Sequence, residues 1–192
     1  WFGLIDPWTL NFFGFRVLIN GEEKQFDDSD DLYQTDVLAN RAVDDIRRFT
    51  AESKPFFISV YPVAPHSGQG KGIPLFESPN RSQPNPVAPA PAPRHVGLYA
   101  DLTYPRGPAY LEQDISDKPP SVQAVRDKIF NGLTQIGLTP QDLDALVDQT
   151  YRTRAESLLA VADLVETMVK ELRATGQLDN TIFVFTSDNG WL

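Results

Sequence analysis

The sequence has no cysteine and only one methionine among its 192 residues. Without cysteine the chain can form no disulfide, no cysteine-ligated zinc or iron–sulfur site, and no thiol nucleophile. It also has no apolar run near the roughly 18 residues that a membrane-spanning helix needs, so we predict no membrane span. The phosphate-binding GxxxxGK[ST] pattern and the zinc-binding HExxH pattern are absent as well.

Basic residues are scarce relative to acidic ones. Lys and Arg total 17 against 26 for Asp and Glu, and the net charge is -9. A chain of this charge repels a phosphate backbone, so we expect no nucleic-acid partner. Carboxylates are, however, ligands that hard cations such as Ca²⁺ prefer.

Apolar bulk is plentiful. Hydrophobic residues make up 41% of the chain and twelve of them are Phe, which is enough for a packed core. We predict one partial domain over residues 1–192. Prolines gather after residue 78, so we predict a long proline-rich loop over residues 79–120 inside that domain. Asn80 begins an Asn-Arg-Ser glycosylation sequon in this loop, which is used only if the chain is secreted.

The spacing of apolar residues predicts two main helices. One runs from Leu32 to about Ser53, where Lys54-Pro55 ends it, and the other runs from Tyr151 to Ala174. Three further elements are predicted from turn and capping signals: a hairpin over residues 12–26 around Asn20-Gly21, and short helices near residues 121–132 and 140–149.

Two short apolar runs have no helical periodicity. Residues 56–61 (FFISVY) and 181–186 (TIFVFT) are nearly continuous in apolar residues, which is typical of strands buried on both faces. Together with the helices they predict an α/β fold with a mostly parallel sheet covered by helices. We expect this sheet to be incomplete and the chain to be a segment, because it begins at Trp1 and stops just after the second run.

The second run is followed by Ser187-Asp188-Asn189-Gly190. Ligands of open α/β sheets gather outside the carboxyl ends of the strands. The carboxylate of Asp188 and the amide oxygen of Asn189 suit Ca²⁺ or Mg²⁺, so both are candidate metal ligands. The same residues are also ordinary β-turn chemistry, and the turn interpretation is favoured when the motif is taken alone.

The first run is followed by Ala64-Pro65-His66. A histidine at this edge can donate a hydrogen bond to an anionic substrate or protonate a leaving group, which makes His66 a candidate catalytic and substrate-binding residue. Taken alone, a surface histidine without a role is the favoured alternative. Arg152 and Arg154, at the start of the second main helix, are interpreted as surface or ion-paired residues rather than as anion binders.

Taken together, these motifs resemble the sulfatase family. The strings that carry the resemblance are KPFFISV (54–60) with Ala64-Pro65-His66, PRH (93–95), DISDKP (114–119), YRTRAESLLAV (151–161), and GQLDNT with FTSDNG (176–190). They cover nearly the whole chain, in the family's order and spacing. The branch they resemble most contains the N-acetylglucosamine-6-sulfatases and arylsulfatase-like proteins.

The resemblance implies an alkaline-phosphatase-like fold and hydrolysis of a sulfated carbohydrate or an aryl sulfate. It implies a Ca²⁺ ion held partly by Asp188 and Asn189, and a sulfate contact from His66. The family's nucleophile is a formylglycine made from Cys or Ser in a C/S-x-P/A-x-R motif, which this sequence does not contain. The family's N-terminal pair of acidic ligands is not visible either, and Ala162 stands where the first of two Asp residues is usual.

The resemblance also implies a secreted, periplasmic or lysosomal protein. Two alternatives remain open at this point. One is a phosphomonoesterase or phosphodiesterase of the same superfamily. The other is a catalytically inactive segment, which the absence of the nucleophile favours for the chain as written.

Overall fold

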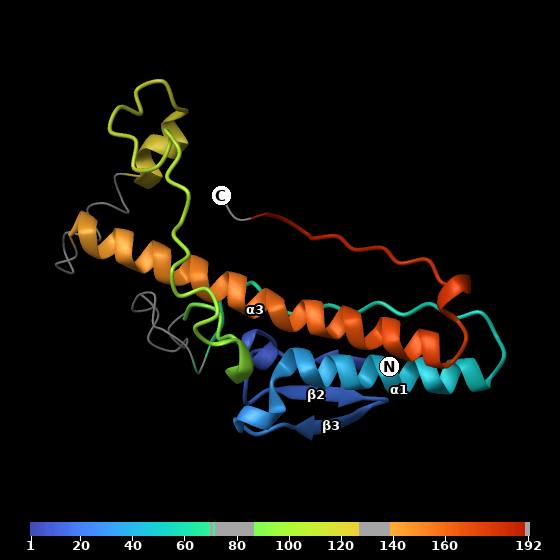
Figure 1. The fold of residues 1–192 in the computed structure, drawn as a ribbon. Coiled ribbons are helices and arrows are strands. Elements are labelled where there is room, and N and C mark those ends of the chain that lie inside the picture. Colours follow the sequence, from blue (N-terminus) through green and yellow to red (C-terminus); the bar gives the residue numbers. More distant parts are fainter. Residues whose placement is uncertain (70, 72–86, 127–138, 191–192) are drawn as a thin grey trace.

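Two long helices and a small sheet form the body of the protein. The computed structural model describes residues 1–69, 71, 87–126 and 139–190. Helix α1 spans Gln34–Ala51 and helix α3 spans Pro140–Ala174. The two lie side by side and run in the same direction, and the N-terminal part of α3 extends past the start of α1 (Figure 1).

The sheet is antiparallel and has three strands, β1 (Phe2–Leu4), β2 (Arg16–Ile19) and β3 (Glu22–Gln25), in that order. The predicted hairpin is confirmed: β2 and β3 are joined at Asn20 and Gly21, whose φ angles of 51° and 98° are those of a tight hairpin turn. Strand β1 was not predicted. The residues that pair between β1 and β2 lie more than a dozen positions apart in the sequence, so no local turn signal predicts this strand.

The core lies where the helices meet the loops that follow β1 and the Phe56 run. One cluster of buried side chains joins the start of α1 to the middle of α3, and it contains Phe12, Phe13, Tyr33, Ala64, Ala90, Ala92, Ala160 and Val161. A second cluster lies farther along both helices, where Leu38 and Ala39 pack against Leu164. The first cluster includes Ala64, so it fixes the end of the segment that carries His66.

The two main helices are confirmed, with one change of boundary. Helix α3 begins at Pro140, so the predicted helices at residues 140–149 and 151–174 are a single helix. Its start is a capping box: the Thr139 hydroxyl accepts a hydrogen bond from the Asp142 backbone, and the Asp142 carboxylate accepts one from the Thr139 backbone. Residues 120–126 are helical, and the rest of the helix predicted there lies outside the described residues.

The predicted parallel sheet is not present among the described residues, whose only sheet is the antiparallel one. Residues 56–61 and 181–186 are drawn as extended chain and are not assigned as strands (Figure 1). Their side chains are also not buried on both faces: Phe57 is 87% exposed and Ile182 is 91% exposed. A strand needs a hydrogen-bonded neighbour, and no described segment lies in that position beside either run.

Both runs nevertheless have the direction that an α/β fold requires. Each follows a helix and returns along it, so the two extended segments run in the same direction as each other (Figure 1). Phe56 stacks on Phe49 of α1 with 5.8 Å between ring centroids, and Val60 packs against the second core cluster. One face of the first run is therefore packed on the helices, while the other face is open.

The proline-rich loop is described only in part. Residues 72–86, which include Asn80, lie outside the described residues. From Val87 onward the chain contains the 3-10 helix η3 (Pro93–His95) and several turns before residue 120. Within the described part of the chain, none of the helices combines the length and the apolar character needed to cross a membrane.

Candidate functional site

The loop that carries His66 is held on both sides by backbone hydrogen bonds. The His66 N–H donates to the Val63 carbonyl over 2.8 Å, which closes a turn that contains the cis Ala64-Pro65 bond. Immediately afterwards Gly68 exchanges two backbone hydrogen bonds with Val87, of 2.8 and 3.0 Å. These hydrogen bonds fix the backbone of the loop, so His66 has a defined position although its side chain is exposed.

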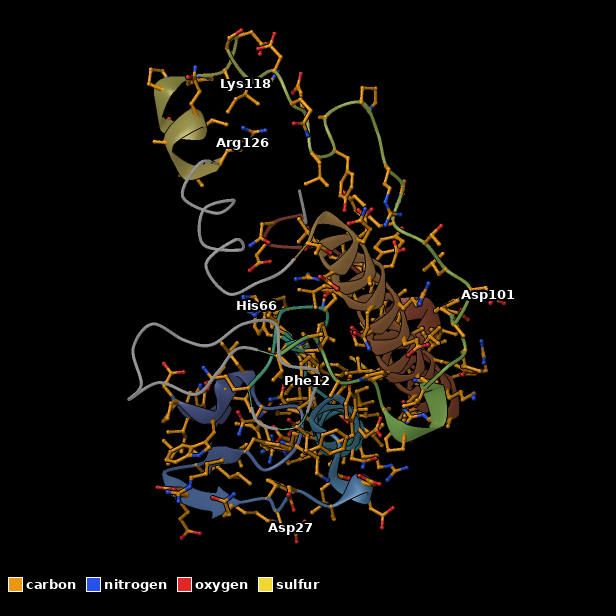
Figure 2. The ribbon with its side chains drawn as sticks, turned by 90° about the vertical axis from the view of Figure 1, so that its left-hand side faces the viewer. Phe12, Asp27, His66, Asp101, Lys118 and Arg126 are labelled. Atoms are coloured by element: carbon orange, nitrogen blue, oxygen red, sulfur yellow. The ribbon has the colours of Figure 1, made fainter. Side chains whose placement is uncertain are left out.

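Gly68 is required at its position because the backbone passes close to an aromatic ring. A Cβ atom built on Gly68 would lie 2.9 Å from two ring carbons of Phe12, a contact that real Cβ atoms do not make. Phe12 is fully buried, so its ring cannot move aside. Figure 2 shows Phe12 and His66 on the same side of α3.

The orientation of the His66 ring is set by its neighbour. Nδ1 of His66 lies 2.7 Å from the carbonyl oxygen of Ser67. A carbonyl only accepts, so this contact places the Nδ1 proton on the ring and leaves Nε2 as the atom that can exchange a proton or contact a ligand.

Ser67 also contacts a basic residue of α3. The Nη2 atom of Arg154 lies 3.4 Å from the Ser67 hydroxyl. Arg154 is half-buried, and this burial lowers the pKa of its guanidinium. The sequence interpretation allowed a surface or an ion-paired position for Arg154, and the structure places this residue half-buried. The missed signal is its spacing, since positions 150, 154, 157 and 161 fall on one face of a helix, and Thr150, Ser157 and Val161 are buried.

The candidate metal ligands lie at the exposed end of the second extended run. Asp188 and Asn189 are both exposed, and the Ser187 hydroxyl donates to the Asn189 carbonyl over 2.6 Å. One carboxylate and one amide oxygen match the chemistry of a Ca²⁺ ligand set, but Ca²⁺ takes six to eight oxygens. Within the described ranges, no three His, Cys, Asp or Glu side chains come close enough together to hold a metal.

Contacts among the described residues do not join His66 to Asp188 or Asn189. What relates them is topology: each group follows the C-terminal end of an extended segment, and the two segments run in the same direction (Figure 1). Parallel strands bring such ends to one edge of a sheet. The role of Asp188 and Asn189 as metal ligands and the role of His66 remain predictions.

A second polar cluster lies between α1, α3 and η3. The Arg94 guanidinium donates to both carboxylate oxygens of Asp36, over 2.7 and 2.8 Å, and to Asp163, over 2.7 and 2.9 Å. Nε2 of the buried His95 lies 3.2 Å from the same Asp163 oxygen. Hydrogen bonds to Asp36, and then to Asp163, raise the pKa of Arg94.

The Arg94 cluster has a structural role, because it joins α1, α3 and η3. One guanidinium is shared by two carboxylates in the cluster, which borders a hollow of about 320 Å³. Residues 114–119, another string singled out in the sequence, are represented by Lys118 in Figure 2, far from His66. Lys118 pairs there with Glu112 and Asp117. The His66 loop, which Arg154 of α3 contacts through the Ser67 hydroxyl, is therefore kept as the candidate site.

Comparison with known proteins gives consistent results. The sequence model of the family described as "Sulfatase" matches residues 3–191. The chain is 31% identical over 98% of its length to a protein named arylsulfatase from Volvox carteri. It is 32% identical over 98% of its length to a protein named sulfatase ppz1 from Metarhizium majus (strain ARSEF 297), and 26% identical over 94% to a protein named N-acetylglucosamine-6-sulfatase from Capra hircus.

These relatives are much longer than the chain. It spans 27% of the Volvox carteri protein, 38% of the Metarhizium majus protein and 27% of the Capra hircus protein. No solved structure matches the chain.

Proposed function

The chain belongs to the sulfatase family, and we propose from this membership that the protein that carries it hydrolyses sulfate esters. The observation that carries the proposal is the family match over residues 3–191, which includes the His66 loop and the Asp188-Asn189 pair at the ends of the two extended runs. The names of the relatives support a sulfated carbohydrate or an aryl sulfate as substrate.

Hydrolysis of a sulfate monoester makes two demands that these residues can meet in part. The sulfate oxygens must be neutralised, and the leaving oxygen must receive a proton. His66 suits either task as the imidazolium, in which Nδ1–H donates to the Ser67 carbonyl and Nε2–H can donate to the sulfate or the leaving oxygen. The backbone hydrogen bonds of the loop hold the ring in place.

We assign Asp188 and Asn189 as two ligands of a Ca²⁺ ion. The ion would supply positive charge that neutralises the sulfate oxygens. Most of its oxygen ligands must come from elsewhere, since the described residues gather no group of three His, Cys, Asp or Glu side chains that could hold a metal. Further strands of a parallel sheet, paired along the edges of the two extended runs, would deliver such ligands at the same carboxyl end.

The nucleophile belongs to the same proposal. The chain has no cysteine and no serine in the S-x-P/A-x-R pattern, so none of its residues can become the formylglycine that the family uses. We therefore place this nucleophile in a longer protein of which these residues are part, and we expect the 192 residues alone to turn over no sulfate ester. We further expect a secreted, periplasmic or lysosomal location, by analogy with the family.

The test uses the longer protein and two substrates that differ only in the ester. p-Nitrophenyl sulfate should be hydrolysed much faster than p-nitrophenyl phosphate, and a chelator should remove the activity until Ca²⁺ is restored. Asp188→Ala should lower kcat/KM by more than the roughly 10- to 100-fold that loss of an outer-shell partner costs. His66→Ala should lower it by about 100-fold or more, as loss of a proton-transfer group does.

A matched control is Asp179→Ala, which removes the same charge from an exposed position nine residues earlier. It should leave kcat/KM unchanged. Faster hydrolysis of the phosphate ester would identify the protein as a phosphoesterase instead. Activity equal to wild type in Asp188→Ala would remove Asp188 from the metal site.

A further inference from the structure

We propose that Gln34 positions His66 for the reaction through the backbone of residues 9–12. The inference rests on the proposed function for the reaction that His66 serves. Its structural basis is a series of contacts: Gln34 holds the backbone of residues 9–12, and these residues hold the backbone that follows His66.

The first step is the environment of Gln34 at the start of α1. Its side chain is fully buried, which is unfavourable for an amide unless hydrogen bonds compensate. The Nε2 atom donates to the carbonyl oxygens of Thr9 and Asn11, over 3.0 and 2.8 Å, so both N–H groups of the amide are used. The Gln34 backbone N–H donates to the Phe12 carbonyl over 2.9 Å. One buried residue therefore attaches residues 9–12 to the helix.

The second step joins residues 9–12 to the loop of the candidate site. The Leu10 carbonyl accepts a hydrogen bond from the Gln69 N–H over 3.0 Å. The buried Phe12 ring lies against Gly68, where it leaves no room for a Cβ atom. A displacement of residues 9–12 would therefore displace both of these loop residues.

The third step is the dependence of the His66 ring on this backbone. The side chain is exposed, and its Nδ1 atom contacts the carbonyl of the next residue, Ser67. A ring held in this way moves with its own backbone, and the hydrogen bond at Gln69 ties that backbone to the segment that Gln34 holds. Position matters for a proton-transfer group, because a misplacement of about 1 Å can cost about 100-fold in rate.

The experiment removes the two side-chain donors of Gln34 in the longer protein. Gln34→Met is close in size and cannot donate, so the carbonyls of residues 9 and 11 lose their attachment to α1. We expect kcat/KM for p-nitrophenyl sulfate to fall by about 10- to 100-fold. In a His66→Ala background the same substitution should cost less than about 2-fold, because no ring remains to be positioned, and a double-mutant cycle of the four proteins measures this coupling.

Hydrogen exchange provides a readout that is independent of the reaction. The amide protons of Gly68 and Gln69 are protected by backbone hydrogen bonds. Gln34→Met should raise their exchange rate by about 10-fold, because the loop opens more easily once the hydrogen bonds that hold residues 9–12 are lost. Mass spectrometry on peptides that cover residues 66–69 would measure the change.

Two further variants separate positioning from a general loss of stability. Ile46→Val removes one methyl group from a side chain that is 1% exposed on the same helix, about three turns after Gln34. It should lower the free energy of unfolding but leave kcat/KM and the exchange of residues 66–69 unchanged. Gln34→Asn keeps the amide on a side chain that is one methylene shorter, so it cannot hold both carbonyls and should lose part of the activity. It also provides the test if Gln34→Met does not fold.

The exchange measurement also separates this inference from the proposed function. If the longer protein does not hydrolyse sulfate esters but exchange in the loop rises in Gln34→Met and not in Ile46→Val, the proposed function fails and the link from Gln34 to the loop stands. If sulfate esters are hydrolysed and the loss from Gln34→Met is the same with and without His66, or exchange in the loop does not change, the function stands and the positioning role is refuted.

Discussion

Tyr33 connects the start of α1 to the loop after Val87 through one buried hydroxyl. The hydroxyl donates to the Ala90 carbonyl over 2.9 Å, and the Tyr33 side chain is fully buried between Phe12 and Phe13. Burial raises the pKa of Tyr33 well above the ordinary value of 10.0, because a phenolate at this position would lose its hydration. The folded chain therefore keeps the Tyr33 proton at pH values where the unfolded chain has begun to lose it.

This burial predicts how stability depends on pH. Tyr33→Phe leaves the Ala90 carbonyl without its donor, so the free energy of unfolding at pH 8 should fall by about 1–3 kcal/mol. Above pH 10 the unfolded chain loses the Tyr33 proton while the folded chain keeps it, so wild type loses about 1.4 kcal/mol per pH unit from this residue. Urea unfolding at pH 8 and pH 11 should therefore show a smaller difference between wild type and Tyr33→Phe at pH 11.

Tyr61→Phe is the control, because Tyr61 is 79% exposed. It should change the free energy of unfolding little, and equally at both pH values. A constant difference between wild type and Tyr33→Phe from pH 8 to pH 11 would contradict the assignment of this pH dependence to Tyr33.

At the scale of elements, two arginines join α1 to α3. Near the start of α1, Arg94 of η3 bridges Asp36 on α1 and Asp163 on α3. Near its end, Arg47 pairs with Glu171 of α3 over 2.8 Å. The two junctions differ in geometry. Arg94 donates to both of its carboxylates over 2.7–2.9 Å, whereas Arg47 donates to Glu171 and lies 3.9 Å from its second carboxylate, that of Asp44.

We predict that Arg94→Gln destabilises the protein more than Arg47→Gln does. The Arg94 side chain is 44% exposed, so solvent screening limits the loss of unfolding free energy to roughly 1 kcal/mol. The Arg47 side chain is 60% exposed, so its loss should be smaller. Both effects should shrink in about 1 M NaCl, where screening acts over roughly 3 Å. Urea midpoints of both variants at low and high salt provide the measurement. Equal losses at the two positions would mean that the second close carboxylate contact of Arg94 contributes nothing.

Sequence reasoning recovered the elements whose signals are local. Helix α1, helix α3 and the turn at Asn20-Gly21 follow from apolar spacing, capping and positive φ angles. Strand β1 and the Arg94 junction were missed, because each depends on partners far away along the chain. The two apolar runs were predicted as paired strands, but pairing depends on a neighbour, and the described residues provide none. For the candidate site, the pinned His66 loop and the place of Arg154 were visible only in three dimensions.

At the scale of the whole molecule, the second extended run is the most exposed apolar segment. Ile182, Val184 and Phe185 are 91%, 85% and 78% exposed, and on the first run Phe57 and Tyr61 are similarly open. Strand β3 is also at an edge, but its four residues are polar or charged, which opposes pairing with another chain. The run at residues 181–186 has no such protection.

We therefore predict that the 192-residue chain self-associates through this run. Val184→Pro removes a backbone donor and disfavours β-pairing, so it should shift the chain toward the monomer. Sedimentation velocity at several protein concentrations would measure the change. The control is Val125→Thr, which removes exposed apolar surface from residues 120–126 without touching either run. It should leave self-association unchanged. A proline at this position would not serve, because it would break the helix.

The result shows whether residues 181–186 associate through their backbone or whether apolar side chains elsewhere hold the chains together. If Val184→Pro gives a monomer and Val125→Thr does not, the contact is a backbone edge, as expected for a sheet that lacks its neighbouring strands. If both variants remain associated, apolar side chains elsewhere hold the chains together. A wild-type chain that is monomeric at every concentration would contradict the prediction itself. The monomeric variant would also be the background of choice for the Tyr33 and Arg94 measurements, because unfolding would then not be coupled to dissociation.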